Sequence, residues 1–424
     1  MKRYLSIFTL LICAFLSSPL DAEDIRAQIA ADYRMAARNS CVYPEGRIQA
    51  PAAAPEGYEP VFIYHHSRHG SRYNGNSDSL LVATMLEARR DGALTDFGID
   101  VTSRIEKYWK ETDGCQWDLT RKGTAQHKAI AKRMYANYPS IFADSTLIDA
   151  RSTVAFRSRL SMDAFCESLK EENPKLVARR ISTPSYKEEF KLIKNDETKR
   201  FASSEGEWRE GYKQLKKEYT TDGKRLASAL FKDSSWLKAR KMSTYSLAQK
   251  MMSIVASAQN IDCELDFSDI FTPEELYGFW APSNYKFCMH YGACPESYGL
   301  MARSAAPIIK SMISQMDAAL KAEKPFVTLR FSHDSFIGRI AAILKTEEGW
   351  TEATDPKGVC DSWNSNNVVP MACNIQFVFF RNGENDVIVS VRLNERDANL
   401  PVGKVFGSFY KWEALRNYME EVSR

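Results

Sequence analysis

Three histidines and two arginines lie within one short stretch, HHSRHGSR at residues 65–72, which directly follows the apolar run VFIY. Such a group suits a metal ion, an anion or a proton transfer. A metal ion fits poorly, because side chains alternate along a strand and His65 and His66 would point to opposite faces. Arg68 and Arg72 would also repel a cation beside His69. We therefore expect no metal site here.

An anion fits the same residues well. A phosphate monoester carries nearly two negative charges at neutral pH, since its second pKa is about 6, and arginine binds phosphate through a planar fork of donors. The order Arg68-His69-Gly70-x-Arg72 places a nucleophile between two cations. Imidazole has an ordinary pKa of about 6.5, so a neutral nitrogen is available for attack at mildly acidic pH. Gly70 allows the backbone to bend closely around the anion.

A second pair of residues completes this chemistry. His333 and Asp334 follow another apolar run, FVTLRF at 326–331. We expect His333 to donate to the same phosphate. Asp334 would protonate the departing alkoxide and later accept a proton from the attacking water.

Three strand–turn–helix units position these groups. The expected strands are 61–64, 145–149 and 326–331, each followed by polar residues and, for the last two, an apolar helical pattern. In open α/β sheets the ligand lies beyond the carboxyl ends of the strands, so the three turns are candidates for one pocket. Residues 25–39 carry a helical pattern. Residues 374–380 and 386–393 read as a hairpin with an Asn382-Gly383 turn, which makes the sheet mixed in direction.

The fold expected is α/β, with a mostly parallel central sheet flanked by helices and a mainly helical insertion. We assign residues 23–162 and 303–424 to the core and 163–302 to the insertion, or cap, because the latter is charged and poor in strand signals. Within the cap, residues 213–250 hold ten basic and three acidic residues. This run is either a solvated helix surface or a source of attraction for a polyanion.

The residues now described resemble the histidine acid phosphatase branch of the histidine phosphatase superfamily, which contains phytases, glucose-1-phosphatases and multiple inositol polyphosphate phosphatases. RHGSR at 68–72 and HD at 333–334 are similar to its two catalytic motifs. Further similarities cover nearly all of the chain after residue 22: LTRKG at 119–123 with Gln126-His127, STVAFR at 152–157 with Ser161 and Phe165, Val369-Pro370, and VSVR at 389–392 with Asn394.

The resemblance implies a role for each matching residue. His69 is the nucleophile that becomes phosphohistidine, and Asp334 is the proton donor. The phosphate clamp comprises Arg68, Arg72, Arg157 and His333. Inspection of the residues alone does not favour Arg157 over Arg159. No metal or other cofactor is implied.

Two departures from the family pattern concern the first motif and the substrate. Asn74 stands where the family commonly has proline, which removes a fixed φ from the turn. Multiple inositol polyphosphate phosphatases typically have His-Ala-Glu where this chain has His333-Asp334-Ser335, a pattern closer to acid phosphatases and bacterial phytases.

The N-terminus and the cysteines indicate export. Lys2 and Arg3, the apolar residues 5–16 and the small residues of 17–22 form a signal-peptide pattern over residues 1–22. The apolar part is too short to span a bilayer, which needs about 20 residues. Eight cysteines remain after it, an even number that suits disulfides, with Cys288–Cys294 and Cys360–Cys373 as candidates. We expect a periplasmic or secreted protein without stable membrane insertion. The remaining chain has 55 basic and 53 acidic residues, which gives no general basis for nucleic-acid binding.

The function expected is an exported phosphomonoesterase acting on a small, polyanionic phosphate ester, foremost an inositol polyphosphate such as phytate. The main alternative is a broad-specificity acid or sugar-phosphate phosphatase of the glucose-1-phosphatase type. A non-catalytic phosphate-ester binding protein is a lesser alternative, because binding alone requires neither His69 nor Asp334.

Overall fold

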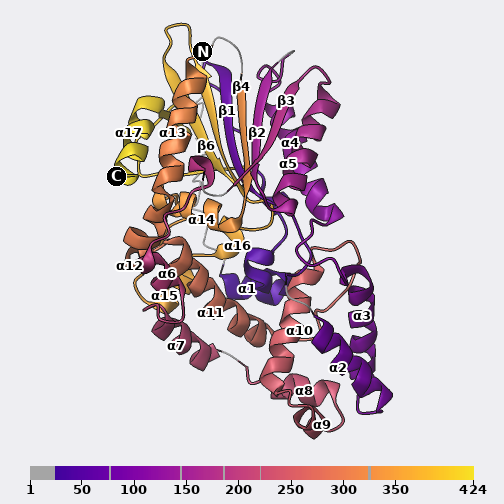
Figure 1. Ribbon diagram of the computed structural model, residues 1–424. Helices are drawn as coiled ribbons and strands as arrows, with labels where there is room; N and C mark the ends of the chain where they lie inside the picture. Colours follow the sequence, from indigo (N-terminus) through magenta and orange to yellow (C-terminus); the bar gives the residue numbers. More distant parts are fainter. Residues whose placement is uncertain (1–23, 76–77, 144–145, 185–186, 220, 323–325) are drawn as a thin grey trace, which may run out of the picture.

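The computed structural model describes residues 24–75, 78–143, 146–184, 187–219, 221–322 and 326–424 (Figure 1). The expected signal peptide, 1–22, lies outside the described residues. Among the described helices, none is both long and apolar enough to cross a membrane.

A single nine-stranded sheet forms the centre of the fold, in the order β3-β2-β4-β1-β5-β6-β9-β8, with β7 paired to β6. The first four strands pair in parallel, and β5 joins β1 antiparallel. The mixed α/β sheet predicted from the sequence is thereby confirmed. The strands are β1 (Glu59–Arg68), β2 (Leu147–Thr153), β3 (Val177–Thr183), β4 (Phe326–Ser332), β5 (Asn374–Arg381), β6 (Val387–Leu393), β7 (Arg396–Asp397), β8 (Lys404–Val405) and β9 (Phe409–Lys411).

The strands differ in detail from the expected ones. β1 does not stop at Tyr64 but continues to Arg68, because its ladder with β4 extends to the pair Arg68 and Ser332. The hairpin of β5 and β6 is confirmed. Its turn is held by the Asn382 side chain, which accepts hydrogen bonds from the backbone N–H groups of Glu384 and Asp386.

Helices cover both faces of the sheet (Figure 1). α4 (Arg121–Asn137) and α5 (Phe156–Glu172) pack on one face, where Ile63 of β1 belongs to the core. α13 (Ala306–Leu320), α14 (Asp334–Ile343) and α17 (Trp412–Val422) pack on the other face, together with Phe62 and Tyr64. Successive side chains of β1 point to opposite faces of the sheet, and apolar residues of β1 are therefore buried under the helices on both faces.

Most other helices form a second layer beyond the carboxyl ends of β1, β2 and β4 (Figure 1). They are α2 (Ser79–Arg90), α3 (Asp96–Thr112), α6 (Asp196–Ala202), α7 (Arg209–Tyr219), α8 (Lys224–Leu230), α9 (Ser235–Ala239), α10 (Thr244–Ala258), α11 (Pro273–Tyr291), α12 (Pro295–Ser297), α15 (Pro356–Ser362) and α16 (Ser365–Val368).

The cap boundaries expected from the sequence do not coincide with this layer. β3 lies within residues 163–302 but pairs with β2 in the sheet, and α5 spans the expected boundary at 162–163. Conversely, α2 and α3 lie within the expected core segment but pack against α10 and α8. Charge and helical pattern did not reveal these contacts, because β3 is a largely exposed edge strand without an apolar run.

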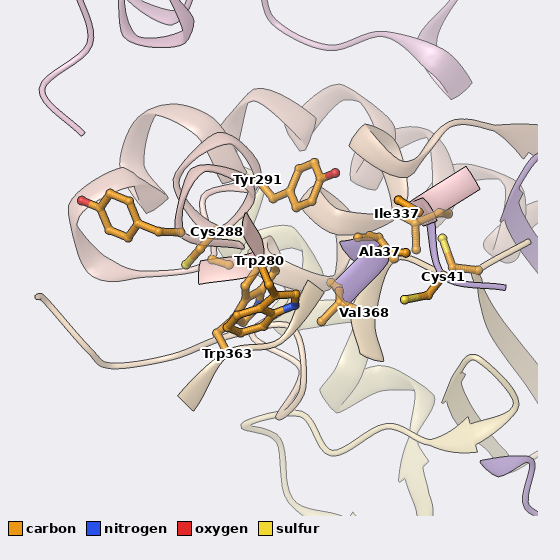
Figure 2. Close-up of a cluster of buried hydrophobic side chains, with 14 of the residues drawn as sticks. Ala37, Cys41, Trp280, Cys288, Tyr291, Ile337, Trp363 and Val368 are labelled. Atoms are coloured by element: carbon orange, nitrogen blue, oxygen red, sulfur yellow. The ribbon is translucent and has the colours of Figure 1, made fainter. Parts of the chain in front are cut away.

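The N-terminal segment joins the two layers. It is not one helix: α1 (Ile25–Ala31) ends at Asp32, which is extended and whose side chain caps the next turn, and η1 (Tyr33–Ser40) follows. Figure 2 shows Ala37 and Cys41 beside Ile337 of α14 and Val368 of α16, in the same buried cluster as Trp280 and Cys288 of α11. This apolar cluster fixes η1 behind the carboxyl ends of the strands.

Candidate active site

The residues of the first motif lie where β1 leaves the sheet. His69 N–H donates to the carbonyl of Ser332 and Ala372 N–H donates to the carbonyl of His69, at 3.0 Å each. These bonds place His69 beside the end of β4, from which His333 follows. The two expected motifs, far apart in the sequence, therefore meet, and the His69 and His333 ring centroids are 5.6 Å apart.

The His69 imidazole is held in one orientation. Its Nδ1 lies 2.9 Å from the carbonyl oxygen of Gly70, and because a carbonyl can only accept, Nδ1 carries the proton and Nε2 keeps its lone pair. Burial, followed by the charge of Arg68 and the proximity of His333 and Arg157, lowers the pKa of His69 well below its usual value. Nε2 of His69 is thus unprotonated over a wider acidic range than the ordinary pKa implies.

The three predicted arginines converge on this histidine. Arg68 is anchored by its Nη1, which donates to the carbonyls of Asn39 at 2.5 Å and Val369 at 2.8 Å. Buried Nε atoms of Arg68 and Arg157 have no hydrogen-bond partner in the described chain. Burial and the charges of Arg68 and Arg157 lower the pKa of Arg72 to about 10. The positive charges of Arg68, Arg72 and Arg157 repel one another, and an anion bound among them would remove this repulsion.

The structure distinguishes Arg157 from Arg159. Arg157 lies at the start of α5, half-buried, and its pKa is lowered by burial and by the charge of Arg68. Arg159 is exposed. Only Arg157 joins the group around His69.

His333 and Asp334 begin α14. His333 Nε2 lies 3.2 Å from Thr153 Oγ1, and burial, then Arg157, lowers its pKa to about 4. For Asp334, burial disfavours the charged form, but Arg68 and two hydrogen bonds outweigh it and hold the pKa at about 2. Its position in the first helical turn acts in the same direction. Without a bound anion, Asp334 is ionised.

Two residues that the sequence analysis did not identify orient Asp334. Asn39 Nδ2 donates to Oδ2 at 2.7 Å and Tyr291 OH donates to the same oxygen at 2.8 Å. Among the described residues, no side-chain hydrogen bond is made to Oδ1. Asn39 also accepts from Arg68 through its carbonyl, so η1 contacts both catalytic motifs. No spacing in the sequence connects residues 39, 291 and 334.

Trp117 was also missed. Its indole lies 4.5 Å from the Arg72 guanidinium and 5.2 Å from that of Arg157, within cation–π range. The side chain remains 47% exposed, and its backbone has a φ of 70°, which is unfavourable for an aromatic residue. Trp117 thus packs against the guanidinium groups of both Arg72 and Arg157.

The remaining family-like residues support the catalytic loop. Ser71 N–H donates to Gln126 Oε1 at 2.8 Å, and Gly70 N–H donates to Ser161 Oγ at 3.1 Å. A Cβ on Gly70 would lie 2.4 Å from the carbonyl oxygen of Gly123, and one on Gly123 would lie 2.2 Å from that of Ser71. The loop and the start of α4 therefore approach more closely than any side chain permits.

Asn74 compensates for the missing proline through hydrogen bonds. Its Nδ2 donates to Ser253 Oγ of α10 at 2.7 Å and to both carboxylate oxygens of Asp78 at 3.2 Å. The turn is therefore tied to a neighbouring helix instead of being fixed by a ring.

The other histidines of the first motif are structural. His65 packs against Phe165, whereas His66 packs against Phe190 and Phe336. The two rings thus lie on opposite faces of the sheet, as the alternation predicted. In the described part of the chain, no group of three or more histidine, cysteine or acidic side chains is arranged to hold a metal ion.

The expected disulfides are absent. All eight cysteines after residue 22 are free, including both candidate pairs. Cys294 instead lies 3.4 Å from the Met289 sulfur. The Cys288 and Cys294 thiols also interact with each other, which adds to burial in raising the pKa of Cys288 and lowers that of Cys294, but they are not joined by a disulfide.

The basic run 213–250 does not gather at the site. α8 and α9 lie at the far end of the second layer (Figure 1). Arg225 is paired with Glu275 and Arg240 with Glu87 and Asp91. Several of its charges therefore serve contacts among the helices.

The chain is similar to known proteins in its sequence pattern and in its fold. A family model described as "Histidine phosphatase superfamily (branch 2)" matches residues 66–394. Multiple inositol polyphosphate phosphatase of Bifidobacterium longum in complex with phosphate is similar in structure, with a TM-score of 0.74, 17% identity, and coverage of 91% of this chain and 97% of that chain.

Two further solved structures share the fold. The same Bifidobacterium longum enzyme in complex with inositol hexasulfate gives a TM-score of 0.71 at 18% identity, covering 89% of this chain and 96% of that chain. The phytase from D. castellii gives 0.64 at 15% identity, covering 96% and 88%. No curated protein matches the sequence.

Proposed function

This chain belongs to branch 2 of the histidine phosphatase superfamily, and from that premise we propose that it hydrolyses phosphate monoesters through a phosphohistidine formed on His69. One observation carries the proposal: the His69 ring presents an unprotonated Nε2 beside three arginines, while Asp334 has one carboxylate oxygen fixed and the other free.

In the first step, Nε2 of His69 attacks phosphorus and the bond to the ester oxygen breaks. Arg68, Arg72, Arg157 and His333 stabilise the charge on the non-bridging oxygens. Asp334 gives a proton to the departing alkoxide. In the second step, water attacks phosphorus, Asp334 takes a proton from the water, and the bond between phosphorus and Nε2 breaks. The proton passes from Asp334 to the phosphate product, which leaves as inorganic phosphate.

The source of the first proton follows from the charges. Asp334 is ionised in the free protein, so the proton must enter with the substrate monoanion, which holds it up to a pKa of about 6. Binding brings negative charge next to the carboxylate and raises its pKa, because the arginine charges are then neutralised. Asp334 thereby becomes the acid.

For the substrate, we propose inositol polyphosphates, phytate foremost. The similarity in fold to an inositol polyphosphate phosphatase and to a phytase supports this choice. We further propose that the protein is exported to the periplasm or secreted, on the basis of the signal pattern in residues 1–22. No metal or cofactor enters the proposed mechanism.

Phosphate release from phytate and from glucose 1-phosphate, compared at mildly acidic pH with EDTA present, tests this proposal. Preferential hydrolysis of phytate supports the assignment. Preferential hydrolysis of glucose 1-phosphate would replace it with a sugar-phosphate phosphatase that uses the same residues. Absence of any hydrolysis by folded protein would favour a phosphate-ester binding protein.

A further inference from the structure

Trp117 contacts two of the arginines that converge on His69. The centre of its indole ring lies 4.5 Å from the Arg72 guanidinium and 5.2 Å from the Arg157 guanidinium. The three residues belong to separate segments: Arg72 follows β1, Trp117 lies in the turn between α3 and α4, and Arg157 lies in the first turn of α5. One aromatic ring is therefore shared by two cations from different parts of the fold.

Neither of these guanidinium groups has a carboxylate partner. Arg72 Nη1 donates to the carbonyl of Tyr73 at 2.8 Å, and the buried Nε of Arg157 has no hydrogen-bond partner in the described chain. Among the residues that the structure describes, no ion pair joins either arginine to an acidic side chain. Burial, and then the charges of Arg68 and Arg157, lower the pKa of Arg72 to about 10. Like charges thus surround Arg72, and the electron-rich face of the indole is an attractive partner for it.

The backbone around Trp117 fixes the position of the indole. Tyr73 N–H donates to the carbonyl of Asp118 at 3.0 Å, and Trp117 N–H donates to that of Asn74 at 3.4 Å, so the turn is bound to the loop after β1. A Cβ on Gly75 would overlap the indole ring, which shows that the ring lies directly against the Gly75 backbone. The ring therefore has little freedom to leave the two arginines.

Packing of the core does not account for this arrangement. The Trp117 side chain is 47% exposed, and its φ of 70° is unfavourable for an aromatic residue. Strained residues of this kind concentrate at functional sites, where the surrounding structure maintains them. Three other tryptophans, in contrast, are fully buried: Trp208, Trp280 and Trp363.

We propose that Trp117 is a positioning residue, whose indole holds the guanidinium groups of Arg72 and Arg157 in the arrangement that accepts a phosphate group before the phosphate arrives. The inference rests on the proposed phosphatase function and adds to it a residue that acts through the arginines. Donors that are already ordered bind an anion more tightly than donors that must first be brought together, because less conformational freedom is lost on binding.

Calorimetric binding of inorganic phosphate tests this role without turnover. Trp117→Leu keeps an apolar side chain and the same backbone strain but removes the aromatic face, so the Kd for phosphate should rise about tenfold. Trp117→Phe retains an aromatic face and should restore most of the affinity. The matched control is Trp236→Leu, because Trp236 lies 3.4 Å from the Arg240 guanidinium at α9, at the far end of the second layer (Figure 1). This control should bind phosphate as the wild type does.

Steady-state kinetics separate positioning from direct contact with the alcohol part of the substrate. If Trp117 acts through the arginines, Trp117→Leu should lower kcat/KM for p-nitrophenyl phosphate and for an alkyl phosphate by similar factors, in parallel with its loss of phosphate binding. Unchanged phosphate binding, with KM altered for one ester only, would overturn the proposal. Equal losses of phosphate affinity in Trp117→Leu and Trp117→Phe would also overturn it, because the aromatic face would then be irrelevant.

Gly75→Ala is a second variant, which retains Trp117 and remains informative if Trp117→Leu does not fold. Its Cβ would displace the indole from the arginines, so phosphate binding should weaken severalfold, whereas wild-type affinity would count against the positioning role. Failure of the wild-type protein to hydrolyse any phosphate monoester would instead refute the proposed function, and the comparison of phosphate affinities would still decide the role of Trp117.

Discussion

Replacement of Arg157 by glutamine gives the sharpest test of the clamp, because the chain provides a control two residues away. Arg157 is half-buried and its buried Nε has no partner in the described chain, so it is available to phosphate. A hydrogen bond to a charged group contributes about 1.5–3 kcal/mol, and each ~1.4 kcal/mol corresponds to a factor of ten. We expect Arg157→Gln to lower kcat/KM roughly 10- to 150-fold.

The control is Arg159→Gln. Arg159 lies on the exposed side of the same helix, where substitutions usually change stability by less than about 0.5 kcal/mol. Both variants remove one positive charge from α5, so a general electrostatic effect would act on both. If Arg157 contacts the phosphate directly, kcat/KM should fall strongly in Arg157→Gln and change by less than about twofold in Arg159→Gln.

The assay is kcat/KM for p-nitrophenyl phosphate, together with the inhibition constant of inorganic phosphate, for both variants and the wild type. Phosphate inhibition should weaken in parallel with kcat/KM for Arg157→Gln, because the clamp holds the product as well. Thermal unfolding should show that both variants are folded. Equal losses in the two variants, or wild-type kinetics in Arg157→Gln, would refute the assignment of Arg157.

Three further predictions follow from the same geometry. Asp334→Asn should slow hydrolysis of alkyl phosphates far more than that of p-nitrophenyl phosphate, whose leaving group needs little protonation; equal slowing in the two rate measurements would argue against a proton donor. Because the pKa of His69 is lowered and that of Asp334 is about 2, a pH profile of kcat/KM should fall as pH rises above about 6, where the substrate loses its proton, and an alkaline optimum would contradict this reasoning. Gly123→Ala should destabilise the fold by roughly 1–3 kcal/mol in urea unfolding, because its Cβ would meet the Ser71 carbonyl; unchanged stability would show that the loop can move away from α4.

The parts of the site that could be predicted from the sequence depend on local rules. Strand–turn–helix units place His69 and His333 at one edge of a parallel sheet, so these residues could be brought together without coordinates. The family resemblance added Arg157, which spacing could not separate from Arg159. In the structure Arg157 is half-buried whereas Arg159 is exposed, and this difference separates the two residues.

The parts that could not be predicted depend on packing between distant segments. Asn39 reaches Asp334 only because η1 packs against α11 and α14 through the cluster in Figure 2. Tyr291 and Trp117 likewise act through contacts of whole helices and turns. The basic run at 213–250 is conspicuous in the sequence, yet its two arginines pair with carboxylates of neighbouring helices.

The position of Asn39 has a consequence for how activity arises during folding. The carboxylate of Asp334 is oriented by one residue near the start of the described chain and by Tyr291 of α11. Contacts between such distant residues carry a high loop-closure entropy and form late. A chain that has folded its sheet but not yet docked residues 25–40 would contain both expected motifs and still lack an oriented Asp334 carboxylate. Enzymatic activity should therefore appear with the last folding phase, and it can serve as a reporter of complete folding.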